Sequence, residues 1–306
     1  MLQKARPTAM TEAVAYMQRT RDWYLALGYG NPYVWAHNKD VPFSGLGRPL
    51  SKSRVALITT AALFQPGKGD QGPGAAYNGA AKFHEVWSHP IDPAPDVRIS
   101  HIAYDRRHTK AEDPRTWFPL ATLKQVEKTG RVGSLTTNVY GFPTNRSQRT
   151  NVETDAPALL EALASEAAQA AILVANCPVC HQSISLAARQ LEAAGIATVV
   201  MGCARDIVEH CGVPRFVFSD FPLGNAAGKP FDEESQQFTL GLALSALEIV
   251  SRPRTMLVSP LEWTPGDDSW KDDYSNPAKL TPEEVVRRRA EFDAAKNTSP
   301  NSAVAG

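Results

Sequence analysis

The chain has 306 residues, 43% of them hydrophobic, which is enough for a sizeable buried core in one large domain or two smaller ones. Its 32 basic and 32 acidic residues cancel, so there is no chain-wide positive field to attract nucleic acid or an anionic membrane. Four cysteines are too few for a disulfide scaffold. The composition therefore favours a small-molecule or protein partner.

The amino-terminal part of the chain is predicted to form a helix and an arm. Residues 1–10, MLQKARPTAM, lack the apolar stretch of a secretory signal, and no segment approaches the roughly 20 apolar residues of a membrane-spanning helix. We therefore expect a cytoplasmic location. Apolar residues at helical spacing over 10–27 predict a helix, and the sequence GYGNPYVW ends it. An extended arm completes this segment, residues 1–52.

Two strands and a helix are predicted next. Residues 54–60, RVALITT, form an apolar, β-branched run of strand length. The glycine- and proline-rich segment 64–79 follows, and a long loop after a strand is common where an α/β protein builds its pocket. A second strand is predicted over 97–104, and a helix over 118–130.

Strands and helices alternate regularly in the second half of the chain. Apolar strands that alternate with helices indicate a parallel or mostly parallel sheet covered by helices on both faces, as in Rossmann-like or flavodoxin-like α/β folds. The predicted strands cover 170–175, 196–201 and 215–220, and the predicted helices cover 154–168, 178–195, 204–212 and 236–250.

These elements define the predicted organisation. Residues 53–262 form the α/β catalytic core, with a division into two α/β halves, 53–150 and 151–262, as the alternative. Residues 263–306 contain a polar, turn-rich segment, a charged amphipathic helix and a tail predicted to be disordered.

Two cysteines three residues apart stand where a strand changes into a helix. Pro178 fits the first position of that helix, so Cys177 lies at its start, where the helix dipole and unpaired N–H groups favour thiolate over thiol. Cys177 is therefore a candidate nucleophile. Cys180, one turn later, can reach it to close a disulfide, and His181 adds a proton-transfer group. Part of a metal site, or simple packing in an apolar core, are the alternatives.

The other cysteines are scattered. Cys203 follows the next strand and is expected to face the same crevice as Cys177, as a second acid or base, a disulfide partner or a metal ligand. Cys211, at a helix end, is assigned to packing. One Cys-x-x-Cys pair with two scattered cysteines does not make the two-pair spacing of a structural zinc site, so no metal is predicted.

Polar residues near the ends of other strands complete the candidate site. His101 and His108 are candidates for proton transfer, and the others for substrate binding. No segment has the glycine order of a phosphate-binding loop, so no nucleotide is predicted. The candidate substrate-binding residues are Thr59, Thr60, Tyr104, Asp105, Cys203, Asp220 and Asn225.

Several segments together carry a resemblance to a known family. The sequences VALITT, YDRRHT, TWFPLATLKQVEKTGRVGSL, NCPVCHQS and MGCARDIVEHCGVPRFVFSDFPLGNAAGKP resemble the selenoprotein B family of glycine, sarcosine and betaine reductases, which is related to a subunit of D-proline reductase. The similarity runs from about Trp35 to about Trp263, and the block 176–230 is its most specific part.

The resemblance implies reductive cleavage of a bond at a substrate carbon. In that family the attacking group is a selenocysteine at the first position of the C-P-x-C stretch, which here is Cys177. Carried over, Cys177 is the nucleophile and Cys180 its resolving partner. Relatives pair this subunit with a pyruvoyl-bearing partner, and this sequence shows no pyruvoyl site.

The expected mechanism follows from these assignments. Cys177 attacks an electrophilic atom of a small substrate and displaces a leaving group, and Cys180 then attacks the adduct to leave a disulfide. His181, or His101 and His108 across the crevice, protonates the leaving group. An external thiol or a thioredoxin-like protein restores the pair, without a tightly bound cofactor. A homo-oligomer is also expected.

Two other functions fit the same residues. Cys177 and Cys203 are able to act as the two thiols of a cofactor-independent racemase or isomerase, which needs no external electrons. Alternatively, a metal on Cys177, Cys180 and Cys203 would make the chain an electron-relay subunit. Epimerisation without added thiol, or a bound equivalent of zinc or iron, distinguishes these functions from the reductase.

Overall fold

The computed structural model describes residues 12–72, 75, 78–101, 103–144 and 146–297. The first residues of the helix predicted from residue 10, and the predicted disordered tail beyond residue 297, lie outside this range. Part of the predicted glycine-rich loop lies outside it as well.

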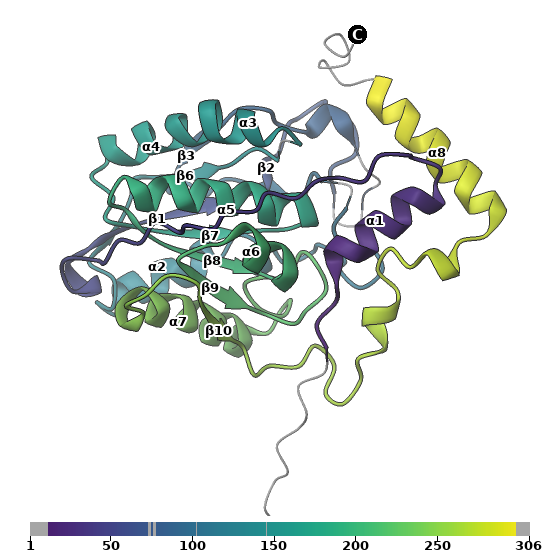
Figure 1. The fold of residues 1–306 in the computed structure, drawn as a ribbon. Helices are drawn as coiled ribbons and strands as arrows, with labels where there is room; N and C mark the ends of the chain where they lie inside the picture. Colours follow the sequence, from purple (N-terminus) through teal and green to yellow (C-terminus); the bar gives the residue numbers. More distant parts are fainter. Residues whose placement is uncertain (1–11, 73–74, 76–77, 102, 145, 298–306) are drawn as a thin grey trace, which may run out of the picture.

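A single eight-stranded sheet forms the centre of the molecule (Figure 1). Its strands run in the order β10-β9-β8-β7-β1-β6-β3, and β5 also pairs with β1. All pairings are parallel except that of β3 with β6. The predicted α/β fold with a mostly parallel sheet is confirmed. The strands are β1 (Arg54–Thr59), β3 (Trp87–Pro90), β5 (Ser134–Leu135), β6 (Asn138–Gly141), β7 (Ala170–Val174), β8 (Ala197–Gly202), β9 (Arg215–Phe218) and β10 (Thr255–Val258).

Helices cover both faces of the sheet (Figure 1). Alternate residues of a strand point to opposite faces, and in β1 Ala56 and Ile58 pack in one core cluster while Val55 and Leu57 pack in the other. The first cluster includes residues of α4 and α5, and the second residues of α2 and α7. The helices are α2 (Leu120–Lys128), α3 (Gln148–Thr150) with a π-helical turn (Asn151–Asp155), α4 (Ala156–Ser165), α5 (Pro178–Ala193), α6 (Arg205–Cys211) and α7 (Glu233–Ile249).

Two terminal helices lie side by side next to this three-layer core (Figure 1). They are α1 (Tyr16–Ala26) and α8 (Pro282–Asn297). The guanidinium of Arg288 lies 5.1 Å from the ring centroid of Trp23, and Arg289 donates a hydrogen bond to the carbonyl of Leu27. Short 3₁₀ turns complete the described structure, at Leu50–Lys52, Gly79–Ala81, Pro114–Thr116, Ser269–Asp272 and Pro277–Lys279.

The strand predicted over 97–104 is wrong beyond its first two residues. Only β4 (Val97–Arg98) is extended, and it pairs with β2 (Ala62–Leu63) in a separate antiparallel ladder. The chain then turns, because the carboxylate of Asp105 accepts the backbone N–H groups of the following residues Arg107 and His108.

The predicted arm is anchored by a buried ion pair. Arg215 of β9 lies 2.7 Å from the carboxylate of Glu192 on α5, and both side chains are 0% exposed. A second nitrogen of Arg215 donates to the carbonyl of Ser44 at 2.7 Å, and the ring of Phe43 lies 4.2 Å from the guanidinium carbon. The pair therefore joins the arm to the sheet and to α5.

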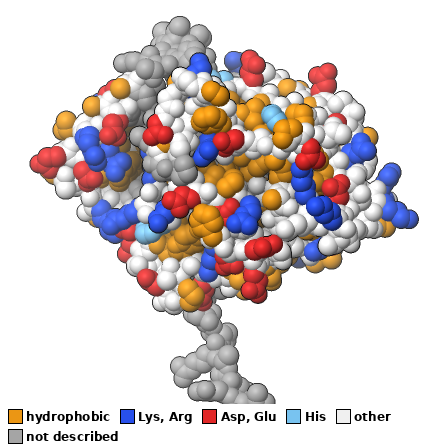
Figure 2. Space-filling view, turned by 180° about the vertical axis from the view of Figure 1, so that it is seen from behind, with side chains coloured by type: hydrophobic (Ala, Val, Ile, Leu, Met, Phe, Trp, Pro, Cys, Tyr) orange, Lys and Arg blue, Asp and Glu red, His pale blue; other side chains and the backbone are white. Residues whose placement is uncertain are grey.

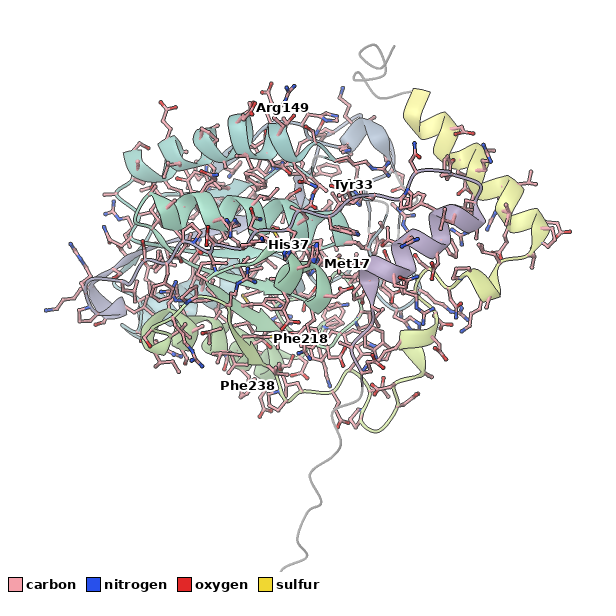
Figure 3. All side chains as sticks on the ribbon, in the orientation of Figure 1. Met17, Tyr33, His37, Arg149, Phe218 and Phe238 are labelled. Atoms are coloured by element: carbon pink, nitrogen blue, oxygen red, sulfur yellow. The ribbon has the colours of Figure 1, made fainter. Side chains whose placement is uncertain are left out.

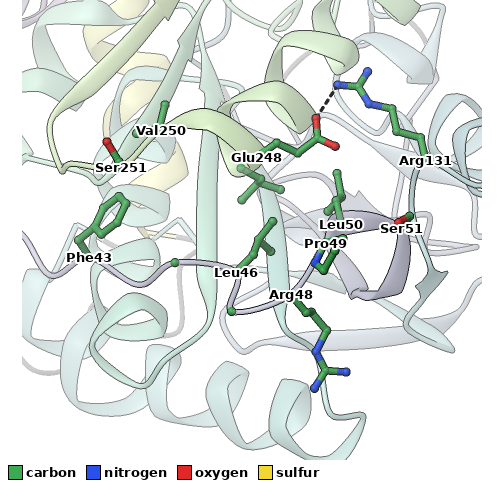
Figure 4. Close-up of a pocket in the computed structure, with 13 residues that line it drawn as sticks. Phe43, Leu46, Arg48, Pro49, Leu50, Ser51, Arg131, Glu248, Val250 and Ser251 are labelled. Carbon is green, nitrogen blue, oxygen red and sulfur yellow. Dashed lines mark hydrogen bonds and ion pairs between the residues drawn. The ribbon is translucent and has the colours of Figure 1, made fainter.

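A cavity of about 670 Å³ opens between this arm and the end of α7 (Figure 4). Arg131 and Glu248 form an ion pair of 3.0 Å at its margin. Leu50 lies just before β1 and Ser251 just before β10, so the cavity lies at the amino ends of the strands. It is thus separate from the carboxyl ends, where the candidate site residues stand.

Charges of both signs are scattered over the face shown in Figure 2. This agrees with the cancelling numbers of basic and acidic residues in the sequence. Within the described ranges, no helix is both long enough and apolar enough to cross a membrane.

The buried ion pair gives a stability prediction. Arg215→Met leaves the carboxylate of Glu192 buried without its cation, and we expect it to lower the free energy of unfolding by about 3–5 kcal/mol in urea titrations. The double variant Arg215→Met/Glu192→Leu should recover most of this loss, since no buried charge remains. The half-exposed pair Arg205–Glu209 is the control, and Arg205→Met should cost less than about 1 kcal/mol. Equal losses in the two single variants would contradict this account.

Candidate active site

The candidate site lies at the carboxyl ends of β1 and β7. The chain leaves β1 towards β6 on one side and returns through β7 towards β8 on the other, so these adjacent strands form a topological switch point. Ligands of open α/β sheets bind outside the carboxyl ends of the strands at such a point. Thr60 follows β1 directly, and Asn176 and Cys177 follow β7. Cys203 follows β8, the next strand, as the sequence predicts.

Cys177 is the N-cap of α5. Its backbone is extended (φ −134°, ψ 170°), and its sulfur accepts the backbone N–H of Cys180 at 3.2 Å. Pro178 occupies the first helical turn, where its missing N–H leaves no bond unmade. The turn from β7 into α5 thus brings both thiol groups of the Cys-x-x-Cys pair together. All four cysteines are reduced and buried.

The two thiols differ in their hydrogen-bonding environment. Burial opposes ionisation of Cys180, but hydrogen bonds from Cys177 and Thr144 outweigh it and lower the pKa of Cys180 to about 7. The hydroxyl of Thr144 lies 3.1 Å from the Cys180 sulfur. Burial and the neighbouring Cys180 sulfur raise the pKa of Cys177 well above its ordinary value. Of the two thiols, Cys180 is therefore the one that ionises more readily near neutral pH.

This distribution differs from the one expected at the helix start. The helix dipole favours a thiolate at Cys177, but complete burial opposes it, and Cys180 has the hydroxyl of Thr144 as an additional hydrogen-bond partner. Lys82 lies near both sulfurs, and its charge favours their ionisation. Burial lowers the pKa of Lys82, and the charge of Arg146 adds to that shift.

His181 links the ends of two strands. Its Nε2 accepts the backbone N–H groups of Cys203 at 2.8 Å and Ala204 at 3.1 Å, so the ring proton is on Nδ1. Nδ1 donates to the carbonyl of Cys177 at 2.7 Å. Burial lowers the pKa of His181 to about 4, which keeps the ring neutral. Both nitrogens are thus occupied by backbone, which gives His181 a positioning role rather than that of an acid.

The other two candidate histidines lie in different surroundings. Nδ1 of His101 accepts the backbone N–H of Ala103 at 3.3 Å, which leaves Nε2–H as a donor. Burial, with nearby charges that include Lys82, lowers the pKa of His101 to about 3, so the ring is neutral. His101 therefore lies on the same side of the thiol site as Lys82. His108 instead lies 3.0 Å from the carboxylate of Asp273.

Several candidate binding residues have structural partners. Thr59 donates its hydroxyl to the carbonyl of Trp117 at 2.9 Å. Asn225 donates to Thr109 and to the carbonyl of Pro222. Tyr104 lines a small cavity of about 30 Å³ with Arg106, whose guanidinium lies 5.3 Å from its ring centroid. These groups shape the loops around the site.

The acidic candidates lie on the side of Cys203. Asp220 forms an ion pair of 2.6 Å with Lys271. Asp105 caps its own loop through one carboxylate oxygen, and its buried Oδ2 has no hydrogen-bond partner in the described structure. Burial and the charge of Asp220 raise the pKa of Cys203, so Cys203 is a thiol at neutral pH.

A segment from the carboxyl-terminal part of the chain lies across the strand ends. We call residues 263–281 the strap. Lys271 of the strap binds Asp220, and the hydroxyl of Tyr274 donates to the carbonyl of Ala103 at 2.8 Å. The ring of Tyr274 packs 5.1 Å from that of Tyr16 at the start of α1. With the strap in place, Cys177 and Cys180 are both 0% exposed.

Helix α1 is fixed at this edge by its first residues. Met17, labelled in Figure 3 beside α6, donates its backbone N–H to the carboxylate of Asp206 at 2.7 Å. Tyr16 is 1% exposed, and its hydroxyl has no partner among the described residues. The α1 helix thus brings a buried phenol to the candidate site.

Sequence reasoning missed five residues around the thiols. Thr144 and Asn176 follow strands β6 and β7, so the rule that selected Thr60 would have found both. Lys82, Tyr16 and Tyr274 come from a loop, a helix start and the strap, and their spacing carries no signal. Within the described ranges, no group of three or more His, Cys, Asp or Glu residues is placed to hold a metal ion.

Known proteins with similar sequences include reductase subunits. The chain is 27% identical over 221 residues to "D-proline reductase subunit gamma" of Acetoanaerobium sticklandii, which covers 71% of this chain and 86% of the relative. It is 25% identical over 233 residues to "Glycine reductase complex component B subunit gamma" of Symbiobacterium thermophilum, and 25% identical over 197 residues to that of Carboxydothermus hydrogenoformans.

The extent of these matches differs. The chain spans about half the length of the two glycine reductase subunits, 53% and 45%. No protein-family model matches the chain, and no solved structure was found to match it. The three similarities support the resemblance carried by the motifs: the chain is a homologue of the gamma subunits of D-proline reductase and of glycine reductase component B.

Proposed function

We propose that this protein is a thiol-dependent reductase that cleaves a carbon–heteroatom bond, or reduces a similar electrophile, of a small molecule. The observation that carries the proposal is the position of Cys177 and Cys180 at the switch point, where the Cys177 sulfur accepts the backbone N–H of Cys180 and hydrogen bonds lower the pKa of Cys180. The names of the relatives supply the reaction class, since they are reductase subunits.

In the first step Cys177 is the nucleophile. Its proton passes to the Cys180 thiolate through the hydrogen bond between them as the Cys177 sulfur attacks the substrate R–X. A bond forms between sulfur and R, and X leaves with the electron pair of the broken bond. His101 is a neutral Nε2–H donor on this side of the site, suited to hydrogen-bond the leaving group.

In the second step Cys180 resolves the adduct. Its sulfur attacks the sulfur of Cys177, a disulfide forms, and R leaves with the electron pair of the sulfur–R bond and takes the proton from Cys180. The substrate gains two electrons and a proton, and the two thiols lose them. This role suits Cys180, because the hydroxyl group of Thr144 stabilises its thiolate.

A thiol reductant must then restore the pair. We propose a low-molecular-weight thiol or a thioredoxin-like protein, which reduces the disulfide through a mixed disulfide. The relatives are named as subunits of reductase enzymes, so association with a further protein subunit is part of the proposal. A homo-oligomer and a cytoplasmic location remain predictions from the sequence.

The reductase fits the thiols better than the racemase does. A two-thiol racemase needs one thiolate and one thiol on opposite sides of the substrate carbon. Burial raises the pKa values of Cys177 and Cys203 alike, whereas the stabilised thiolate is on Cys180, in contact with Cys177. The thiol with the low pKa is therefore a member of the Cys-x-x-Cys pair, and a thiolate is the form that reacts to make a disulfide.

The two cysteines should respond differently to substitution. Cys177→Ser should abolish any substrate adduct, because a serine hydroxyl stays protonated near neutral pH and is a far poorer nucleophile. Cys180→Ser should form the adduct but stall, since no second thiol can release it. Intact mass spectrometry after incubation with betaines, halogenated acids, and sulfur or nitro compounds measures the adducts.

Three outcomes are informative for this pair. Rescue of Cys180→Ser turnover by a millimolar external thiol would support the resolving role. If Cys180→Ser loses the adduct and Cys177→Ser keeps it, the roles are reversed. If both variants keep full turnover, the pair is structural and the reductase proposal fails. Cys211→Ser is the matched control, because that buried cysteine lies at the end of α6.

The ionisation of the pair is testable by pH dependence. A Cys180 pKa of about 7 means that its thiolate forms as the pH rises through 7, so iodoacetamide labelling should rise there rather than near 9. Thr144→Val removes one hydrogen bond to the thiolate and should move the midpoint upward by about one pH unit. Thr59→Val is the control, since that hydroxyl binds the carbonyl of Trp117. Identical midpoints in wild type and Thr144→Val would refute this assignment.

A further inference from the structure

The residue before the nucleophile has a buried amide with no partner. Asn176 is 1% exposed, and neither its Nδ2 nor its Oδ1 makes a hydrogen bond within the described structure. Asn225, at 2% exposure, instead donates to Thr109 at 2.6 Å and to the carbonyl of Pro222 at 3.0 Å. Buried polar groups are nearly always hydrogen-bonded, so an amide with both ends unpaired indicates a missing partner.

The fold directs this amide away from the face of the sheet on which Cys177 packs. Side chains alternate along an extended chain, and both Ala175 and Cys177 pack in the core cluster that includes α4 and α5. Asn176 therefore faces the other side, where Tyr16 and Cys203 belong to the second cluster. A small molecule that lies across the end of β7 would meet the Cys177 sulfur on one side and the Asn176 amide on the other.

We propose that Asn176 binds the substrate of the thiol reaction, and that its amide pairs with a planar group that presents an acceptor and a donor side by side, such as a carboxamide. Nδ2–H would donate to the substrate oxygen, and Oδ1 would accept from its N–H. The inference rests on the proposed reductase function and extends it, because it specifies the kind of group that is recognised.

If Asn176 serves to bind a ligand, its unpaired amide should lower the stability of the protein without ligand. Asn176→Leu replaces an unpaired amide with an apolar side chain of similar size, so it should raise the melting temperature of the protein without ligand. Asn225→Leu is the matched control, and it should lower the melting temperature because its hydrogen bonds are made. A melting temperature lowered by Asn176→Leu as much as by Asn225→Leu would show a structural amide and overturn the inference.

Alkylating reagents test recognition directly. Iodoacetamide carries a carboxamide, whereas iodoacetate has the same reactive carbon but offers only acceptors. The preference ratio is the rate of labelling of Cys177 and Cys180 by iodoacetamide divided by the rate by iodoacetate, measured from peptide mass spectra. We expect this ratio to be about tenfold larger for wild type than for glutathione. In Asn176→Leu and Asn176→Asp this excess should disappear, because the first loses both hydrogen bonds and the second loses the donor.

The outcomes separate the inference from the proposed function. Equal preference ratios in wild type and Asn176→Leu would overturn the role of Asn176 and leave the thiol chemistry intact. If neither reagent labels either thiol in folded wild type, while the unfolded chain is labelled by both, the proposed thiol chemistry fails and the inference fails with it. Loss of the excess in both Asn176 variants, with Asn225→Leu retaining it, would support the assignment.

Discussion

The neutral ring of His181 fixes the relative position of the two strand ends on which the site depends. It donates to the backbone at Cys177 and accepts from the backbone at Cys203, so the ends of β7 and β8 are joined through one side chain. The fit is close, because a Cβ atom on Gly202 would lie 2.5 Å from the ring. A protonated ring could not accept these N–H groups, and burial keeps the ring neutral. The histidine beside the Cys-x-x-Cys pair therefore contributes geometry.

Reactivity at this site is a balance between burial and hydrogen bonding. Removing water disfavours a thiolate on either cysteine, and for Cys177 this effect prevails. For Cys180, hydrogen bonds from the hydroxyl of Thr144 and from the other thiol outweigh this effect. In the proposed reaction, the Cys180 thiolate can therefore take the proton of Cys177 as the Cys177 sulfur attacks the substrate. The nearby charge of Lys82 acts in the same direction.

The sequence allowed the central strands and the cysteine turn to be predicted, but not the enclosure of the site. The apolar run AAILVA predicts a strand, and Pro178 after Cys177 indicates the start of a helix. Tertiary packing reinforces both local signals. Strands β3 (WSHP) and β6 (NVYG) were missed because polar residues, proline or glycine interrupt any apolar run in them, and β10 (TMLV) was missed as well. The placement of Thr144 against Cys180 depends on the pairing of β6 with β1. The contacts of Lys271 with Asp220 and of Tyr274 with Tyr16 join segments that are far apart in the sequence, which no local pattern reveals.

The strap has a consequence for the order of events in catalysis. It contacts the loops after the strands through the Lys271–Asp220 ion pair and the packing of Tyr274 on Tyr16, and both thiols are buried. In the proposed reaction, the substrate and the reductant must therefore reach the same pair of sulfurs by the same route, one after the other. Such a protein works by a ping-pong scheme, in which oxidised and reduced enzyme alternate and no complex holds both reactants.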